Sequence, residues 1–213
     1  MQRPDPIHAV VFDFDGLLAD TETSWAIAEK AMFTTRGMPY GEHERGLFLG
    51  TAVAETAAIM AACFDEPQPA VLTEVLARAG VELQRSAPAM PGAAALLSGL
   101  RGKVPYAVAS NTPRDLLELS LVGSGLAPLV EIVVAGDEVP RGKPAPDVYL
   151  KACALLDVEP ARAVAIEDSV TGATAARAAG LWVAMIPSGP ADASAADQFL
   201  SSLEDAELLS WFD

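Results

Sequence analysis

The chain has 213 residues, of which 51% are hydrophobic and 20% are charged, and its formal net charge is −15. This length fits one sizeable core, or a core with a small second domain, and the strong negative charge argues against nucleic acids and anionic membranes as partners. No apolar stretch approaches the roughly 18 residues of a membrane span, and the N-terminus lacks the apolar segment of a secretory signal. We therefore expect a cytoplasmic protein, and we expect it to be a monomer.

The first predicted element is a buried strand over residues 7–13 that ends in acidic residues. Its apolar run is typical of a strand covered on both faces of a parallel sheet. Asp13 ends the run and Asp15 follows two residues later, so the two side chains point the same way, roughly 7 Å apart. One carboxylate of such a pair can attack a phosphorus atom while the other serves the leaving group. Taken alone, the motif fits a solvated acidic turn equally well.

Residues 21–87 interrupt the pattern and show helical periodicity without any strand-like run. Apolar positions indicate helices around 25–33, 53–60 and 71–76, and Gly37 is expected to end the first of them. We interpret this stretch as an all-helical insert over the strand ends, hinged near 19–21 and 85–91 and able to open and close. The alternative is one continuous domain with a helical layer.

After the insert, apolar runs alternate with helical stretches. Strands are predicted over 104–110, 131–135, 163–167 and 182–186. Helices are predicted over 92–101, 113–122, 146–156 and 170–179. This alternation predicts right-handed crossovers and a parallel sheet, so the fold class is α/β. Thr112 and Pro113 indicate a helix N-cap followed by proline at the first helical position, and Gly180 indicates a helix end.

Polar residues follow two of these later strands. Ser110 comes directly after the second strand, where its hydroxyl and nearby backbone N–H groups can hold phosphate oxygens. Lys143 lies in a loop after the third strand, stiffened by Pro144 and Pro146, and can neutralise phosphate charge and bridge to Asp13. Taken alone, a serine such as Ser110 is more often a helix cap, and a lysine such as Lys143 is more often an ordinary surface residue.

Glu167 and Asp168 end the fourth strand. Adjacent acids repel each other there unless a cation or a hydrogen-bond network compensates. Together with Asp13 they offer oxygen ligands of the kind that Mg²⁺ prefers. An isolated pair is usually a solvated turn, but here every motif falls on the same edge of the predicted sheet. The combination predicts one site with a nucleophile, a second acid, a hydroxyl, a lysine and metal-binding carboxylates.

With these four motifs in order, the chain resembles the haloacid dehalogenase superfamily, and most closely its β-phosphoglucomutase-like phosphatases with a small helical cap. The matching segments are residues 13–20, 110–111, 142–147 and 166–169. The resemblance covers essentially the whole chain. It implies a Rossmann-like parallel sheet core of residues 1–19 and 89–213 and an inserted helical cap of residues 20–88.

The resemblance also implies roles for the site residues. Asp13 would be the nucleophile that forms an aspartyl-phosphate. Asp15 would protonate the leaving oxygen and then activate the hydrolytic water. Ser110, Asn111 and Lys143 would hold the transferring phosphate.

The implied cofactor is Mg²⁺. Its ligands would be Asp13, the backbone carbonyl of Asp15 and Asp168, with Glu167 either among the ligands or directly behind them. The implied function is a Mg²⁺-dependent phosphatase that acts on a small phosphorylated metabolite, either a sugar phosphate or a phosphorylated organic acid. The identity of that substrate is left open.

Other activities of the superfamily fit less well. Its dehalogenases lack the second aspartate, which is present here as Asp15. Phosphonate cleavage needs a cap lysine that forms a Schiff base. Lys30 is the single lysine between residues 21 and 88, and it lies in the first predicted helix with the charged Glu29 beside it. A non-catalytic binding protein on the same fold is a further alternative, but retention of the acidic residues and of Lys143 argues against it.

A sugar-phosphate mutase is the main alternative. Mutases of the β-phosphoglucomutase type use a cap histidine and a cap arginine, and the matching positions here are Trp25 and Val53. Both departures favour hydrolysis. Arg36 and Arg45 remain in the cap as possible substitutes for the missing arginine.

Overall fold

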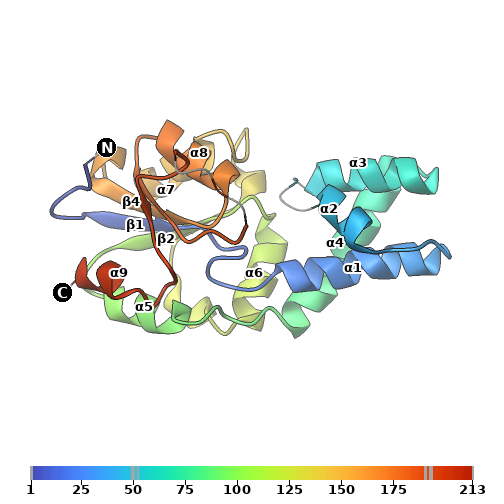
Figure 1. Cartoon of the computed structure of the whole chain (residues 1–213), viewed down its shortest axis with the longest axis horizontal. Coiled ribbons are helices and arrows are strands. Elements are labelled where there is room, and N and C mark those ends of the chain that lie inside the picture. Colours follow the sequence, from blue (N-terminus) through green and yellow to red (C-terminus); the bar gives the residue numbers. More distant parts are fainter. Residues whose placement is uncertain (1, 49–50, 52, 190, 192–193, 213) are drawn as a thin grey trace.

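The computed structural model describes residues 2–48, 51, 53–189, 191 and 194–212. The predicted core and cap ranges also include residues 1, 49–50, 52, 190, 192–193 and 213, which lie outside the described part. The chain forms a sheet layered with helices and, beside it, a separate group of helices (Figure 1). No helix in the described part is long and apolar enough to cross a membrane.

Within the described residues, the strands form one parallel sheet in the order β3-β2-β1-β4-β5-β6. Their bounds are β1 Ala9–Phe12, β2 Tyr106–Ala109, β3 Val133–Val134, β4 Ala163–Glu167, β5 Trp182–Met185 and β6 Gln198–Phe199. β1 lies between β2 and β4, with Val10 opposite Tyr106 and Val164. Because the strands are parallel, their carboxyl ends meet at one edge, as the sequence predicted.

Helices cover both faces of the sheet, because successive strand residues point to opposite sides. Val10 and Phe12 contribute to the apolar cluster under one set of helices, and Ala9 and Val11 to the cluster under the other. The first set is α5 Ala93–Leu100, α6 Arg114–Gly123 and α9 Ala206–Ser210. The second is α7 Asp147–Leu155 and α8 Val170–Ala178 (Figure 1). Short 3-10 helices η1 Ala127–Leu129, η2 Gly136–Glu138 and η3 Pro160–Arg162 connect these elements.

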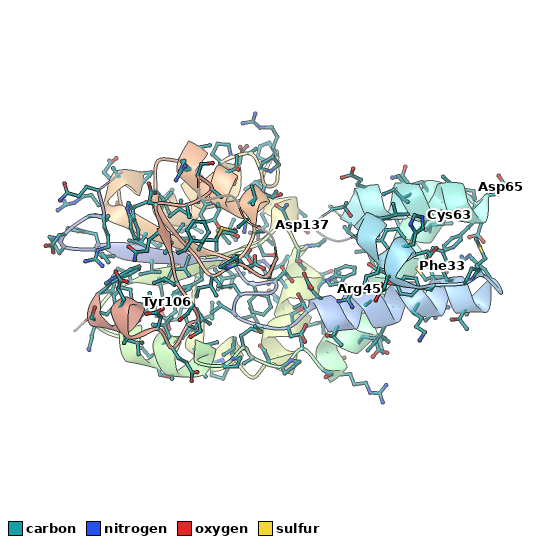
Figure 2. The ribbon with its side chains drawn as sticks, in the orientation of Figure 1. Phe33, Arg45, Cys63, Asp65, Tyr106 and Asp137 are labelled. Atoms are coloured by element: carbon teal, nitrogen blue, oxygen red, sulfur yellow. The ribbon has the colours of Figure 1, made fainter. Side chains whose placement is uncertain are left out.

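The insert contains four helices within the described residues, one more than predicted. They are α1 Glu22–Thr35, α2 Glu42–Phe48, α3 Val53–Phe64 and α4 Gln68–Arg85. They enclose a hydrophobic core of their own, which includes Phe33 (Figure 2). The Phe33 and Phe64 rings lie 4.8 Å apart between centroids. Gly37 follows the end of α1 with φ +68°, as predicted. The predicted fold class, an α/β core with an inserted helical cap, is confirmed.

The insert meets the core at a close helix pair, α4 and α6. A small apolar cluster joins Ala79 and Leu83 of α4 to Leu116 of α6. Gly123 of α6 lies so near α4 that an added Cβ would collide with the backbone carbonyl oxygen of Leu83. The two connecting segments also run together, since Asp20 N donates to the Pro88 carbonyl at 2.9 Å. The insert is therefore held both by its paired connections and by the contact between α4 and α6.

We expect the Gly123→Ala variant to be less stable than the wild type, by about 1–2 kcal/mol in the free energy of unfolding. Alanine normally stabilises a helix by roughly 0.5–1 kcal/mol relative to glycine, whereas overpacking costs about 1–3 kcal/mol, and here the clash is with backbone. Urea unfolding measures the difference. Gly99→Ala in α5 is the matched control, because no atom lies within 4 Å of its added Cβ. Equal stabilisation of both variants would contradict the close α4–α6 contact.

Candidate active site

A buried lysine joins two of the predicted carboxylates at the carboxyl-end edge of the sheet. Lys143 Nζ donates to Asp13 Oδ1 at 2.5 Å and to Glu167 Oε1 at 2.6 Å. Asp13 directly follows β1 and Glu167 ends β4, so the parallel pairing of these neighbouring strands places both acids side by side. The three side chains are at most 8% exposed. The predicted bridge from Lys143 to Asp13 is present.

The charges in this cluster do not balance. Burial raises the pKa of Asp13 well above its ordinary value; Lys143 opposes this, while Glu167 and Asp168 add to it. Burial and then the charge of Glu167 raise the pKa of Asp168 to about 7. Burial would lower the pKa of Lys143, but the charges of Asp13 and Glu167 outweigh it and raise that pKa. The site therefore holds a persistent ammonium beside three acids, and each charged acid makes it harder for the others to ionise.

This acidic cluster fits a hard divalent cation. Asp13, Glu167 and Asp168 are all buried, and each offers a carboxylate oxygen within 4.8 Å of the others. Such an all-oxygen donor set suits Mg²⁺, and a cation would offset the carboxylate repulsion. Gly16 leaves space beside the cluster, because an added Cβ would lie 2.5 Å from Asp168 Oδ2. Gly16 also has φ +83°, a conformation that favours glycine.

Three hydroxyl groups hold the second aspartate. Thr21 Oγ1 donates to Asp15 Oδ1 at 2.8 Å, and Ser110 Oγ and Thr112 Oγ1 donate to Asp15 Oδ2 at 2.5 and 2.9 Å. Ser110 is therefore at the predicted strand end, and in this structure its hydroxyl contacts Asp15. The sequence motifs did not predict the contacts of Thr21 and Thr112 with Asp15, although Thr112 lies only two residues after Ser110.

The predicted N-cap role of Thr112 is wrong. Helix α6 begins at Arg114, and no side-chain capping bond comes from the preceding residue, Pro113. Arg114 N instead donates to the carboxylate of Asp137 at 2.9 Å. The Thr112 side chain points inward, and its hydroxyl binds Asp15 instead of capping helix α6.

Asn111 braces the loop that carries the lysine. Its Nδ2 donates to the Lys143 carbonyl at 3.1 Å, and its Oδ1 accepts from Lys143 N at 2.7 Å. An added Cβ on Gly142 would lie 2.6 Å from Asn111 Oδ1, so the glycine permits this contact. Both polar atoms of the side chain are engaged with the Lys143 backbone, which fixes where the ammonium can reach.

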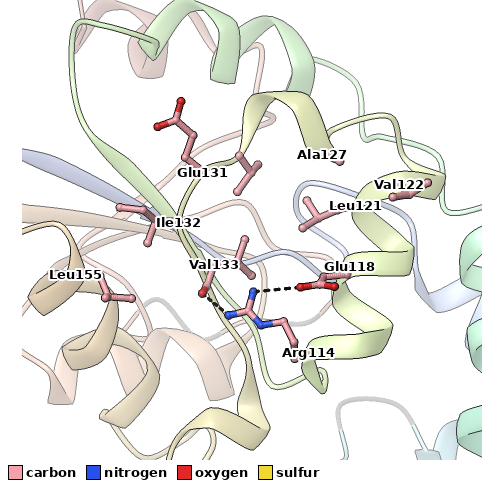
Figure 3. A pocket seen from close by; sticks show the side chains of 10 residues that line it. Arg114, Glu118, Leu121, Val122, Ala127, Glu131, Ile132, Val133 and Leu155 are labelled. Atoms are coloured by element: carbon pink, nitrogen blue, oxygen red, sulfur yellow. Dashed lines mark hydrogen bonds and ion pairs between the residues drawn. The ribbon is translucent and has the colours of Figure 1, made fainter.

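All seven predicted site residues lie at this sheet edge, in two hydrogen-bonded or closely placed groups. One contains Asp13, Asn111, Lys143, Glu167 and Asp168, and the other contains Asp15 and Ser110. A cavity of about 670 Å³ lies elsewhere, beside the edge strand β3 (Figure 3). Arg114 lines it and donates to the Val133 carbonyl at 2.7 Å. None of the predicted site residues lines this cavity.

The fold and the site define a known class of enzymes. A family model for haloacid dehalogenase-like hydrolases matches residues 7–180, and the chain belongs to this family. Its structure is similar to that of CbbY from Rhodobacter sphaeroides in complex with phosphate, with a TM-score of 0.84 and 29% identity over 97% of this chain and 99% of that one.

Curated relatives narrow the class further. The chain is 34% identical to validoxylamine A 7'-phosphate phosphatase of Streptomyces hygroscopicus subsp. limoneus, over 92% of this chain and 93% of the relative. It is 32% identical to hexitol phosphatase B of Escherichia coli K12, over 96% of both chains. The predicted enzyme class, a hydrolase of phosphoric monoesters, is confirmed.

Proposed function

We propose that the chain is a Mg²⁺-dependent phosphatase that hydrolyses a small phosphate monoester through an aspartyl-phosphate at Asp13. The observation that carries this proposal is the buried ammonium of Lys143, placed 2.5 Å from Asp13 and 2.6 Å from Glu167 at the edge where β1 and β4 end. The substrate class is a sugar phosphate or a phosphorylated organic acid. Two relatives support the first of these, since they are named for validoxylamine A 7'-phosphate and for hexitol.

The first proposed step transfers the phosphoryl group to the protein. A carboxylate oxygen of Asp13 attacks phosphorus, the bond from phosphorus to the ester oxygen breaks, and Asp15 gives its proton to that oxygen. Lys143 opposes the repulsion between the anionic nucleophile and the anionic phosphate. We assign the grip on the phosphate oxygens to Lys143 and to the Ser110 hydroxyl, which would turn from Asp15 to the phosphate. Asn111 would support this grip by holding the Lys143 backbone.

The second proposed step hydrolyses the aspartyl-phosphate and regenerates the free Asp13 carboxylate. Water attacks the phosphorus of the aspartyl-phosphate, gives a proton to Asp15, and releases inorganic phosphate and the free Asp13 carboxylate. Dividing hydrolysis into two displacements makes each easier. A positioned acid–base group typically contributes about 10²–10⁴-fold to the rate. Thr21, Ser110 and Thr112 hold the Asp15 carboxylate in the orientation described above.

We assign the Mg²⁺ ligands to Asp13, Asp168 and the backbone carbonyl of Asp15, with Glu167 beside them. When bound, the ion would offset negative charge on the phosphoryl group and on the surrounding carboxylates. Support for this assignment comes from the buried triad of Asp13, Glu167 and Asp168 and from its unbalanced charge.

We further propose that residues 20–88 act as a cap that moves over a core of residues 1–19 and 89–213. The two connections lie side by side, with Asp20 N bonded to the Pro88 carbonyl and Met90 N bonded to the Leu18 carbonyl, both at 2.9 Å. Adjacent connections let a domain turn about one axis, and such a turn would also have to shift the contact between α4 and α6. Closure of such a lid excludes water and adds contacts that select the substrate.

The contacts within the insert favour a phosphatase over a mutase. Trp25 and Val53, which stand where mutases carry a histidine and an arginine, pack against the apolar cluster of the insert. Arg36 binds Glu66 and Glu74, both at 2.7 Å, and is 17% exposed. This arginine is therefore committed to carboxylates of its own domain. Arg45 is more accessible and lies 3.9 Å from Glu22.

A panel of phosphate monoesters tests the proposed function. The panel contains hexitol phosphates, small phosphorylated acids and β-glucose 1-phosphate, the last with catalytic glucose 1,6-bisphosphate and Mg²⁺. We expect at least one member to release inorganic phosphate in step with its consumption, and we expect no glucose 6-phosphate. Rapid formation of glucose 6-phosphate without matching phosphate would instead identify a mutase, and no phosphate release from any member would remove the phosphatase proposal.

A further inference from the structure

A buried tyrosine outside the predicted motifs contacts both charges of the lysine–glutamate pair. Tyr149 lies in α7, and no part of it is exposed. Its hydroxyl donates to Glu167 Oε1 at 2.6 Å, the same oxygen that accepts from Lys143 at 2.6 Å. The Lys143 ammonium also lies 5.1 Å from the centroid of the tyrosine ring. Tyr149 thus holds the glutamate through its hydroxyl and faces the lysine with its ring.

The other oxygen of Glu167 is held from the opposite side. Oε2 accepts from the backbone N–H groups of Asp168 and Ser169 at 3.1 and 3.2 Å, and from the Ser169 hydroxyl at 3.1 Å. Gly172 of α8 makes room for this carboxylate, because an added Cβ would collide with it. Rotation of the carboxylate would therefore break bonds on both sides.

We propose that Tyr149 is a positioning residue whose hydroxyl anchors Glu167 Oε1, so that Lys143 stays within reach of Asp13 and of the phosphoryl group that Asp13 receives. The ammonium is shared between two carboxylates, so its place depends on where each of them lies. Without the tyrosine hydroxyl, Lys143 is the remaining side-chain donor to Glu167 Oε1 in the described residues. The ammonium is then drawn toward Glu167 and away from Asp13. This inference rests on the proposed function.

The variant Tyr149→Phe removes the hydroxyl and keeps the ring and its contact with Lys143. We expect kcat to fall about tenfold, which corresponds to about 1.4 kcal/mol, with KM within about twofold of wild type. A merely structural tyrosine would not lower kcat selectively. Tyr106→Phe is the matched control: its hydroxyl also makes one short bond, to the Leu129 carbonyl at 2.5 Å, outside the site. We expect its kcat to stay within about twofold of wild type.

The assay uses the best monoester of the panel, with urea unfolding of both variants and inhibition by orthovanadate. Vanadate takes the five-coordinate geometry of the transition state, and its inhibition constant does not depend on the folded fraction of the sample. We expect that constant to rise about tenfold in Tyr149→Phe alone. A kcat within twofold of wild type, or equal losses in both tyrosine variants, would overturn the role of Tyr149 and leave the phosphatase proposal intact. An inactive wild type would overturn both.

Discussion

Replacing Asp13 with asparagine is expected to lower kcat by at least about 10³-fold, because the amide is a poor nucleophile and cannot form the aspartyl-phosphate. Asparagine has nearly the same shape, so it keeps its place after β1. The substitution leaves Lys143 paired with Glu167 at 2.6 Å. Phosphate release from the best monoester, measured over several hours, gives the residual rate.

The same variant is expected to remain folded. Burial raises the pKa of Asp13 well above its ordinary value, so its charged form is costly in the folded protein, and a neutral amide removes that cost. The free energy of unfolding in urea should therefore not fall. Asp115→Asn, at an exposed position in the first turn of α6, is the matched control and should keep full activity. An Asp13→Asn rate within tenfold of wild type would remove Asp13 as the nucleophile.

Removal of divalent metal is expected to reduce phosphate release to background. Asp13, Glu167 and Asp168 are buried within 4.8 Å of one another, and one ammonium does not balance them. Dialysis against a chelator followed by the assay measures the loss, and added Mg²⁺ should restore the rate. Excess Ca²⁺ should inhibit, because it prefers longer bonds and looser coordination than Mg²⁺.

Asp168→Asn makes the metal prediction specific to the site. The amide removes one charged ligand, so the Mg²⁺ concentration needed for half-maximal rate should rise at least about tenfold, in line with losses at other metal sites. Asp115→Asn again serves as the control and should respond to Mg²⁺ like the wild type. Full activity in the presence of chelator would take the metal out of the mechanism.

The core strands and most helices could be predicted because their signals are local. Residues 163–167 form the predicted strand with the same bounds, and the other predicted strands begin or end within about two residues of the observed ones. Apolar runs mark strands buried on both faces, and polar residues at the ends of these runs mark the sheet edge. Parallel pairing then brings Asp13 and Glu167 together. The position of Lys143 depends instead on its loop, which Asn111 holds.

Other parts depend on tertiary contacts that leave no local signal. Helix α2 is polar and buries Phe48 alone among its described residues, so it has no apolar period. Strand β6 has two residues, too few for a pattern. The sequence pattern predicts Thr112 as a helix cap, and Tyr149 falls within a predicted helix with no role assigned to it. Nothing nearby in the sequence shows that Asp15 and Glu167 lie opposite these two residues.

The place of β1 in the sheet has a consequence for how the chain folds. β1 is synthesised first, but its neighbours come late, since Val10 lies opposite Tyr106 and Val164. The whole helical insert, with its own hydrophobic core, leaves the ribosome before β1 gains its second partner. Local helical contacts form faster than pairings between distant residues, so we expect the insert to fold before the sheet. We therefore expect a nascent chain that ends before β4 to carry the folded insert without Glu167, because Asp13 meets Glu167 only after residues 163–167 have been synthesised.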